Sequence, residues 1–433
     1  MMDRLQELLR TARTPMYANA NALVANQVLS AGLGMLYWIL AARLFPVQTV
    51  GASSAVISTL LLVSGVSQLG FGGGMTRFLP RAGMRTRRLI LVSYGAVVMT
   101  SAVLSVAFVA LGGALGLKGV LGDGPFLAMW AVAATVLWSI FRLQDAVLIG
   151  LRQAKWVLIE NAIYNVSKIV LLFVGVRSLA KAGIVGSWFL PTPIVIVLCT
   201  WLIFGVFTRS SRLSPAPVGT KHLTVREVAL SSGGDHVGSM VAEAASRLLP
   251  LLIVAVLGAA ANAYFYQAWL VATTLGLLAS GTTDSFTAEA AADRPNSGRY
   301  SRDILRYMSL LILPAAAILA IGAPLILMLF GKTYAAEGTT LLRWLCLATP
   351  LLIFNSWYLA YARVVGKIRR VVWLQCIAAV LLLGLSYLFL KPFGITGVAF
   401  AWILSEAAIT VVGVFDSRAV LFGSGRTNEG AAS

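Results

Sequence analysis

The sequence predicts an all-α integral membrane protein, with twelve transmembrane helices arranged as two six-helix lobes. Hydrophobic residues make up 59% of the 433 positions, charged residues make up only 12%, and the mean hydropathy is +0.85. Soluble domains do not have this composition. Loops rich and poor in Lys and Arg also alternate along the chain, which is typical of a multi-pass membrane protein.

Each predicted span is an apolar stretch long enough for the hydrocarbon core of a bilayer, which requires about 20 helical residues. Residues 1–15 come first, as a short amphipathic segment without the small-residue cleavage site of a removed signal peptide. The twelve spans are expected at residues 16–42, 48–74, 88–116, 125–150, 156–180, 183–207, 228–257, 261–286, 303–330, 340–362, 371–390 and 395–421.

The distribution of basic residues predicts the orientation of these spans. Alternate segments, beginning with the amino-terminal one, carry 25 of the 34 Lys and Arg residues, and the segments between them carry six. Because basic loops stay on the cytoplasmic side, we expect both termini in the cytoplasm and the chain in the cytoplasmic membrane. The net charge of +18 therefore reflects topology, and it predicts anionic lipid headgroups as neighbours and no nucleic-acid partner.

The chain also has the signs of an internal duplication. The polar linker RSSRLSPAPVGTK has six predicted spans before it and six after it, which predicts lobes at residues 1–215 and 216–433. Late in the first half stands LAKAGIVGSWFL and late in the second FLKPFGITGVAFAW, each with Gly-Ile-x-Gly opening a final span. Because six is even, the halves share one orientation and form a parallel repeat, with a site expected between them near the midplane.

The seventh predicted span carries four polar residues at four-residue steps, namely Asp235, Ser239, Glu243 and Arg247. This spacing places them on one helical face, and a charge at the bilayer centre costs about 2.5–3.5 kcal/mol on insertion scales. The face must therefore contact protein or a water-filled cavity. Glu243 precedes Arg247 in the order that favours an ion pair. The pair is either a structural salt bridge or part of a substrate site.

A second polar face lies in the fifth predicted span, where Glu160, Asn161, Tyr164, Asn165 and Lys168 share one side of the helix. Lys168 is about twelve residues into the span, too deep for its ammonium group to reach a membrane surface easily. We expect the two faces to line one substrate cavity. The predicted cavity residues are Lys168, Arg247, Glu243, Asp235, Tyr164 and Asn165.

Two other charged residues allow two interpretations each. Glu406 lies inside the last span and either accepts a proton or is a buried hydrogen-bond partner. Arg343 lies either in a segment flat on the outer surface or within the tenth span. The candidates for coupling transport to an ion gradient are Glu243, Asp235 and Glu406.

The sequence carries no motif that predicts an enzyme. The three cysteines, Cys199, Cys346 and Cys376, lie in apolar runs without metal or disulfide spacing, and we expect them only to pack. There is no Walker motif for ATP hydrolysis and no cluster of nucleophiles or metal ligands. No catalytic residue, metal site or cofactor is therefore expected.

Several segments carry a family resemblance. AARLFPVQTVG and SQLGFGGGMTRFLPRAG near the beginning resemble the opening of oligosaccharide flippases that export polyprenyl-linked glycans. LFGKTYAAEGTTLLRW, GKIRR and FGITGVAFAW, followed by Glu406 within the last span, resemble later landmarks of that family. The resemblance implies membership of the multidrug/oligosaccharidyl-lipid/polysaccharide (MOP) exporter superfamily. It also implies a V-shaped, MATE-like transporter whose two lobes work by alternating access around a cationic cavity.

The function that this resemblance implies is the transfer of a polyprenyl-phosphate- or diphosphate-linked oligosaccharide across the cytoplasmic membrane of a prokaryote, for cell-surface polysaccharide synthesis. Glycan polymerases or glycosyltransferases of the same pathway are the expected partners. The alternatives are an ion-coupled multidrug or cation antiporter of the same superfamily, a lipid II flippase and a membrane-bound glycan enzyme. The similar lipid II flippases carry fourteen spans, two more than are predicted here.

Overall fold

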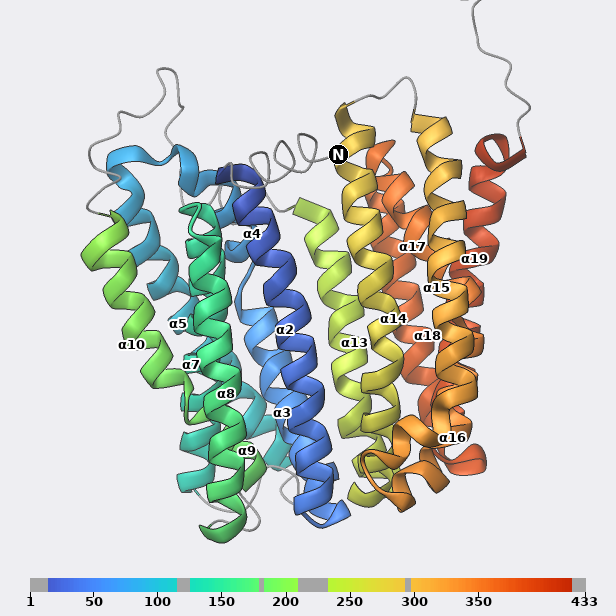
Figure 1. Ribbon diagram of the computed structural model, residues 1–433, viewed down its shortest axis with the longest axis horizontal. Coiled ribbons are helices and arrows are strands. Elements are labelled where there is room, and N and C mark those ends of the chain that lie inside the picture. The colour runs from blue at the N-terminus through green and yellow to red at the C-terminus, as the bar shows by residue number, and fades with distance from the viewer. Residues whose placement is uncertain (1–14, 115–124, 179–182, 209–232, 293–296, 423–433) are drawn as a thin grey trace, which may run out of the picture. The chain divides into compact units, whose positions relative to one another are not determined.

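Helices form all the regular secondary structure that the computed structural model describes, which covers residues 15–114, 125–178, 183–208, 233–292 and 297–422 (Figure 1). Within these ranges, ten helices are long and apolar enough to cross a membrane, and an eleventh span results if one bent pair of helices is counted as a single span. The protein is therefore a multi-pass helical membrane protein, which confirms the predicted fold class.

The chain divides into two compact units, and the first is Met1–His236. In this unit α2 packs along α8, α5 packs along α7, and α3, α4 and α10 also contact α7. Its described α-helices are α2 (Pro15–Leu44), α3 (Val47–Ser67), α4 (Phe71–Phe78), α5 (Thr86–Ala114), α7 (Pro125–Gly150), α8 (Ala154–Ser178), α9 (Gly183–Phe189) and α10 (Thr192–Trp201).

The second unit is Val237–Ser433. Here α18 packs along α19, while α14 contacts α15, α16 and α17. The helices of this part of the chain are α13 (Gly233–Leu257), α14 (Ala259–Ala292), α15 (Ser297–Met328), α16 (Lys332–Leu347), α17 (Thr349–Val364), α18 (Ile368–Phe393) and α19 (Thr396–Phe422).

Most predicted spans correspond to one helix, and four differ in an informative way. The predicted span 340–362 corresponds to α16 and α17, which are bent by 45° at the break between them. The predicted span 183–207 is divided by a turn between α9 and α10, where Pro191 stands. The predicted span 261–286 lies within α14, which is not among the ten apolar helices and which carries Asn262 and Gln267 in its first turns.

The predicted span 48–74 is broken between α3 and α4. Leu69 and Gly70 both have positive φ angles, 46° and 81°, so the helical hydrogen-bond ladder is interrupted there. Gln68 fixes the break by donating from Nε2 to the backbone oxygen of Ser139 on α7 at 2.7 Å. The break turns α4 so that Phe71 and Met75 face the interior of the unit.

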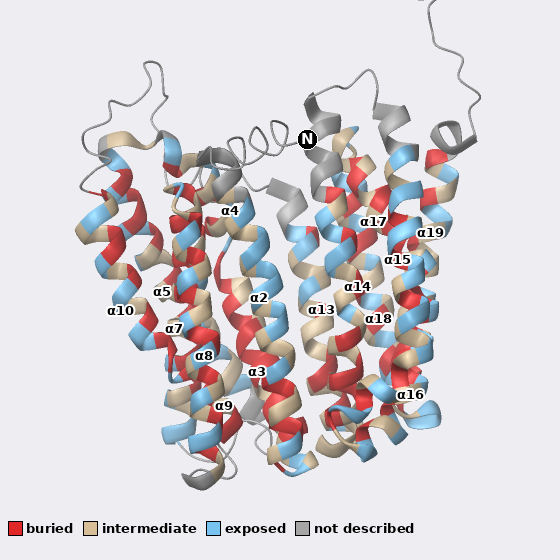
Figure 2. Cartoon of the chain, viewed as in Figure 1, coloured by how far each residue is buried: buried red, intermediate tan, exposed pale blue. Residues whose placement is uncertain are grey.

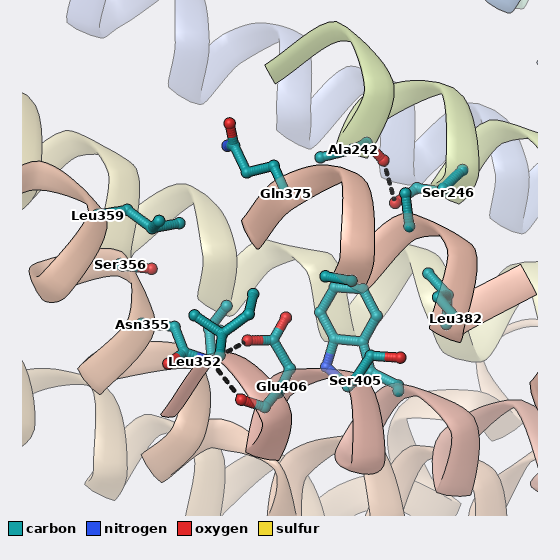
Figure 3. A pocket seen from close by; sticks show the side chains of 15 residues that line it. Ala242, Ser246, Leu352, Asn355, Ser356, Leu359, Gln375, Leu382, Ser405 and Glu406 are labelled. Carbon is teal, nitrogen blue, oxygen red and sulfur yellow. Dashed lines mark hydrogen bonds between the residues drawn. The ribbon is translucent and has the colours of Figure 1, made fainter. Parts of the chain in front are cut away.

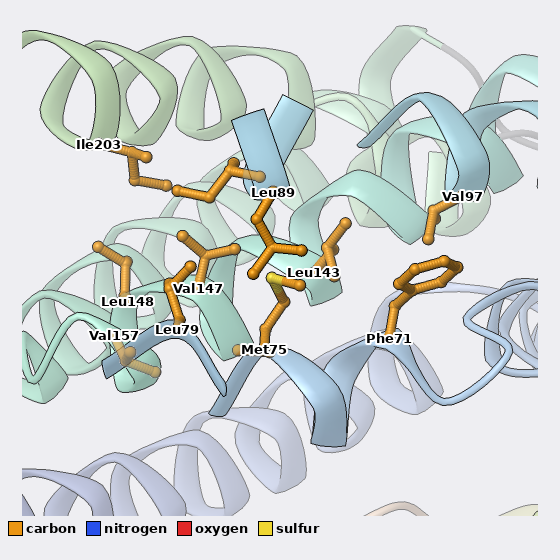
Figure 4. Packing of buried hydrophobic residues seen from close by; sticks show 12 residues of the cluster. Phe71, Met75, Leu79, Leu89, Val97, Leu143, Val147, Leu148, Val157 and Ile203 are labelled. Atoms are coloured by element: carbon orange, nitrogen blue, oxygen red, sulfur yellow. The ribbon is translucent and has the colours of Figure 1, made fainter. Parts of the chain in front are cut away.

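The apolar core of the first unit lies around α4 and α7 (Figure 4). Met75 and Leu79 pack against Leu143 and Val147, and all four side chains are almost completely buried. The backbones approach closely at Gly150, where an added Cβ would lie 2.6 Å from the carbonyl oxygen of Met75. Only glycine allows this approach of α7 to α4.

In both units buried residues are concentrated where helices face one another (Figure 2). Many large apolar side chains are nevertheless exposed, as expected for a membrane protein. On α10, for example, Ile194, Val197 and Trp201 are all exposed and recur at helical spacing. Lipid rather than water covers such a face, because apolar side chains and hydrocarbon tails are compatible.

The predicted lobe boundary at residues 215 and 216 lies outside the described residues. The parallel repeat relating the two halves stays a prediction.

Candidate functional site

The polar face of α13 consists of Ser239, Glu243 and Arg247 in the described part of this helix. The ion pair predicted from the spacing is present, since Arg247 donates from Nε to Oε1 of Glu243 at 2.9 Å and its Nη2 lies 2.9 Å from the same oxygen. The two side chains are 29% and 45% exposed, respectively. They form a partly solvated pair, so the cost of separating them is closer to that of a surface salt bridge than to that of a buried one.

Asp235 lies in the first turn of α13, where the described residues include the backbone but not this side chain. Its predicted place in the cavity therefore stays a prediction.

Lys168 lies inside the first unit, with only 3% of its surface exposed. Its Nζ is 4.1 Å from the ring centre of Trp188, 4.9 Å from that of Tyr37 and 5.1 Å from that of Tyr164. Aromatic faces attract cations, and the attraction is strongest away from water. In the described ranges no carboxylate forms an ion pair with Lys168, so the three rings are its electrostatic partners.

Two of the three rings in this aromatic cage (Tyr37, Tyr164 and Trp188) are held by hydrogen bonds to the backbone of α9, and the third belongs to α9 itself. The hydroxyl of Tyr37 donates to the backbone oxygen of Ile184 at 2.8 Å, and that of Tyr164 donates to the backbone oxygen of Trp188 at 2.9 Å. Tyr37 and Trp188 also meet edge to face, with ring centres 5.2 Å apart. These contacts fix the positions of the rings around Lys168.

Asn165 lies one turn before Lys168 on α8 and is also buried. Its amide donates to the backbone oxygen of Asn161 at 2.8 Å and approaches Ser30 of α2 at 3.5 Å. The contact with Ser30 connects α8 to α2. The Asn165 amide is therefore used in helix packing, and its predicted role in substrate binding stays a prediction.

A cavity of about 180 Å³ lies within the second unit, among α13, α17, α18 and α19 (Figure 3). Glu406 and Asn355 meet at its wall, where the Asn355 amide donates to the carboxylate and, at 2.8 Å, to the backbone oxygen of Glu406. Thr410 completes the network by donating to Asn355 Oδ1 at 2.9 Å. Gln375 also lines the cavity, and its buried Oε1 has no hydrogen-bond partner in the described residues.

Glu406 is thus a hydrogen-bond partner, as one of its two interpretations predicted, and its partner is Asn355. Because Glu406 also lines a cavity, its role as a proton acceptor stays a prediction. Arg343 lies on α16 before the 45° bend and is exposed, with Nε 3.3 Å from the backbone oxygen of Ala320 on α15.

The structure brings some of the predicted cavity residues together. Lys168, Tyr164 and Asn165 are neighbours in the first unit, and Glu243 and Arg247 are neighbours in the second. Neither unit contains both basic residues. A shared cavity for Lys168 and Arg247 stays a prediction.

Two charged clusters were not predicted from the sequence. In the first unit Asp145 of α7 and Glu160 of α8 lie side by side, and the Cys199 thiol of α10 donates to Glu160, so this cysteine does more than pack. In the second unit Asp416 accepts hydrogen bonds from Lys367 Nζ at 2.9 Å and from Arg370. Asp145 and Asp416 both lie inside predicted apolar spans. An acidic residue within such a span was the sequence signal that could have identified these two clusters.

Among the described residues there is no group of three or more His, Cys, Asp or Glu side chains that could hold a metal ion.

The chain matches no protein-family model and no curated protein sequence. It does match solved structures. A multidrug resistance MATE family transporter of the MOP superfamily, in an inward-facing conformation, aligns with a TM-score of 0.68 and 17% sequence identity, over 93% of this chain and 100% of that one.

The lipid II flippase MurJ, in an inward closed conformation, also aligns with a TM-score of 0.68, at 13% identity over 92% of this chain and 87% of that one. A third match is a MOP superfamily transporter from Pyrococcus furiosus described as having reverse polarity of the binding pocket, with a TM-score of 0.60 and 16% identity over 94% of this chain and 97% of that one. Such identities establish the fold alone. The chain therefore has the fold shared by MATE transporters and the lipid II flippase MurJ.

Proposed function

We propose that this protein is a flippase that moves a polyprenyl-phosphate- or diphosphate-linked oligosaccharide across the cytoplasmic membrane of a prokaryote by alternating access. The product supplies cell-surface polysaccharide synthesis. A lipid-linked glycan has an anionic headgroup and a long apolar tail. Only the headgroup has to leave water, and fixed cations can replace the hydration that it loses.

The observation that carries this proposal is the environment of Lys168. A lysine ammonium is held within the membrane-spanning part of the first unit by three aromatic rings, and in the described residues no carboxylate neutralises it. Such a site adds positive potential to the interior of the protein, which favours an anionic substrate and disfavours a cationic drug.

The ion pair on α13 supports the same choice of substrate. A cation antiporter that used Glu243 would need this carboxylate to be available, and in the structure Arg247 lies 2.9 Å from it. Arg247 retains further N–H donors, because only Nε and Nη2 contact Glu243. We propose that these donors bind the phosphate groups, since a guanidinium matches phosphate geometry.

The energetics of export agree with this assignment. With the cell interior negative, moving an anion outward is favourable by about 2.3 kcal/mol per charge per 100 mV. The membrane potential could therefore drive the transfer of a phosphate or diphosphate without ATP. Asp235, Glu243 and Glu406 are the residues first proposed for an additional ion coupling, and Glu406 lines the cavity of the second unit.

Transport in vesicles tests the proposal. The purified protein is reconstituted, and inward and outward movement is measured for a fluorescent polyprenyl diphosphate-linked disaccharide and for an organic cation, ethidium. We expect movement of the lipid-linked disaccharide and none of ethidium. The variant Lys168→Met keeps the length of the side chain without its charge, and it should lose transport while remaining folded. Movement of ethidium alone would refute the flippase assignment and support the antiporter.

A further inference from the structure

A pair of acidic side chains lies within the first unit, away from the residues assigned to phosphate binding. Glu160 of α8 is only 2% exposed, and the carboxyl group of Asp145 on α7 lies within hydrogen-bond reach of it. Glu160 is six residues from the start of α8, or about 9 Å along the helix. Both residues are therefore inside membrane-spanning helices, where an ionised acid is costly.

Asp145 and Glu160 receive hydrogen bonds from different donors. Asn161 donates from Nδ2 to Asp145 Oδ1 at 3.0 Å, and an amide donor of this kind stabilises a carboxylate. The Cys199 thiol donates to Oε2 of Glu160. The second oxygen, Glu160 Oε1, is buried and receives no hydrogen bond from any residue that the structure describes.

Within the described part of the chain, one basic group interacts with the pair. Arg142, one turn before Asp145 on α7, attracts the Asp145 carboxylate. Tyr94 of α5 interacts electrostatically with Glu160, and the Cys199 thiol of α10 hydrogen bonds to it. Neither of these groups is a cation. One basic group against two acids leaves one negative charge too many for a buried site.

Two carboxylates cannot hydrogen bond to each other unless one of them carries a proton, and adjacent acids in one buried site therefore hold one proton between them. The donors identify the member that carries it. Asp145 has an amide donor and a nearby guanidinium, whereas Glu160 Oε1 has no donor and is the oxygen left to be protonated.

We propose that Asp145 and Glu160 form a proton-binding site, protonated on Glu160, that couples movement of the lipid-linked substrate to movement of one proton in the opposite direction. Binding forms an O–H bond at Glu160 with a proton taken from water, and release returns the proton to water and leaves two carboxylates. No electron is transferred. The coupling part of this inference rests on the proposed flippase function, while the proton site does not.

The site also differs in location from the earlier coupling candidates. Glu406 belongs to the second unit, whereas Asp145 and Glu160 belong to the first. Glu160 lies about two turns before Lys168 on α8. In the proposed topology α8 begins on the cytoplasmic side, so the pair is placed toward the cytoplasmic half of the membrane. A proton that enters from outside would be released to the cytoplasm from here.

Infrared spectroscopy of the full-length protein in lipid vesicles tests the proton site without any substrate. The wild type should show the carbonyl band of a protonated carboxyl group at neutral pH. Glu160→Gln should remove the Glu160 contribution to this band, and Asp145→Asn should weaken the band, because the Arg142 guanidinium is then left with one acid instead of two. Cys199→Ala should shift the band to higher frequency, since one hydrogen bond to this carboxyl is lost. The exposed residue Glu337 gives the control variant Glu337→Gln, which should leave the band unchanged.

Vesicles that contain a trapped pH-sensitive dye test the coupling. Adding the fluorescent polyprenyl diphosphate-linked disaccharide should produce a pH change in the lumen with wild type and with Glu337→Gln, and none with Glu160→Gln. A carbonyl band of unchanged intensity in Glu160→Gln would overturn the proton site. A band that is lost while the coupled pH change persists would overturn the coupling. If wild type fails to move the lipid probe at all, the flippase function fails, and the infrared result still decides the proton site.

Discussion

Removing the charges of the Glu243–Arg247 pair on α13 separates a structural salt bridge from a phosphate-binding arginine. The decisive variant replaces both residues with glutamine, because it removes the pair without stranding either charge. Arg247→Gln alone and Arg247→Lys complete the series. Lysine keeps the positive charge but lacks the planar fork of donors that can bind phosphate through two hydrogen bonds.

The structure sets the magnitudes. Breaking a fully buried pair by removing one partner costs about 3–5 kcal/mol, but these side chains are 29% and 45% exposed. Their coupling should therefore be near the range of exposed pairs, about 0.2–1 kcal/mol, and all three variants should remain folded and expressed. Loss of a charged hydrogen bond to phosphate removes about 1.5–3 kcal/mol, which corresponds to an affinity loss of about 10- to 150-fold.

The assay measures the concentration dependence of disaccharide-lipid transfer in vesicles, with thermal unfolding as the check on folding. We expect the double glutamine variant and Arg247→Gln to need about 10- to 150-fold more substrate, and Arg247→Lys to fall between them and wild type. Transport by the double variant at the wild-type substrate concentration would show that the pair is only structural. The assignment of Arg247 to phosphate would then be wrong.

Two further predictions concern topology and packing. A cysteine that replaces Lys332 should be labelled by an impermeant thiol reagent from outside the cell, and one that replaces Arg87 should not, since basic loops stay in the cytoplasm. Labelling of both positions, or the reverse pattern, would contradict the predicted orientation. Gly150→Ala should lower stability by about 1–3 kcal/mol, seen as a lower thermal unfolding temperature, because its Cβ would lie 2.6 Å from the Met75 carbonyl oxygen. Gly276→Ala, where nothing lies within 4 Å of the added Cβ, is the matched control and should not be destabilised; equal losses in both variants would show that packing at α4 is not the cause.

Because this chain lies in a membrane, its fold class can be predicted from its composition. Backbone polar groups cannot be left unpaired in hydrocarbon, so an apolar stretch of sufficient length has to become a helix. The positions of most spans follow from this constraint. The spacing of Glu243 and Arg247 likewise determines their ion pair, because four residues return to the same helical face whatever the rest of the protein does.

The breaks within spans were less accessible to prediction. The interruption at Leu69 and Gly70 and the bend between α16 and α17 depend on local backbone geometry and on what each half-helix packs against. Hydropathy is averaged over about 20 residues, so a stretch with a break in it has the same average as a straight helix.

The sequence by itself determined the membrane environment, the helical class, the approximate spans and the polar faces of two helices, because each of these depends on neighbouring residues in the chain. The tertiary structure alone decided what those faces meet. It surrounded Lys168 with rings from α2, α8 and α9, and it placed Asp145 beside Glu160 from two helices. Helical periodicity fixes the direction of a side chain around its own axis, whereas the partner it finds depends on how separate helices pack.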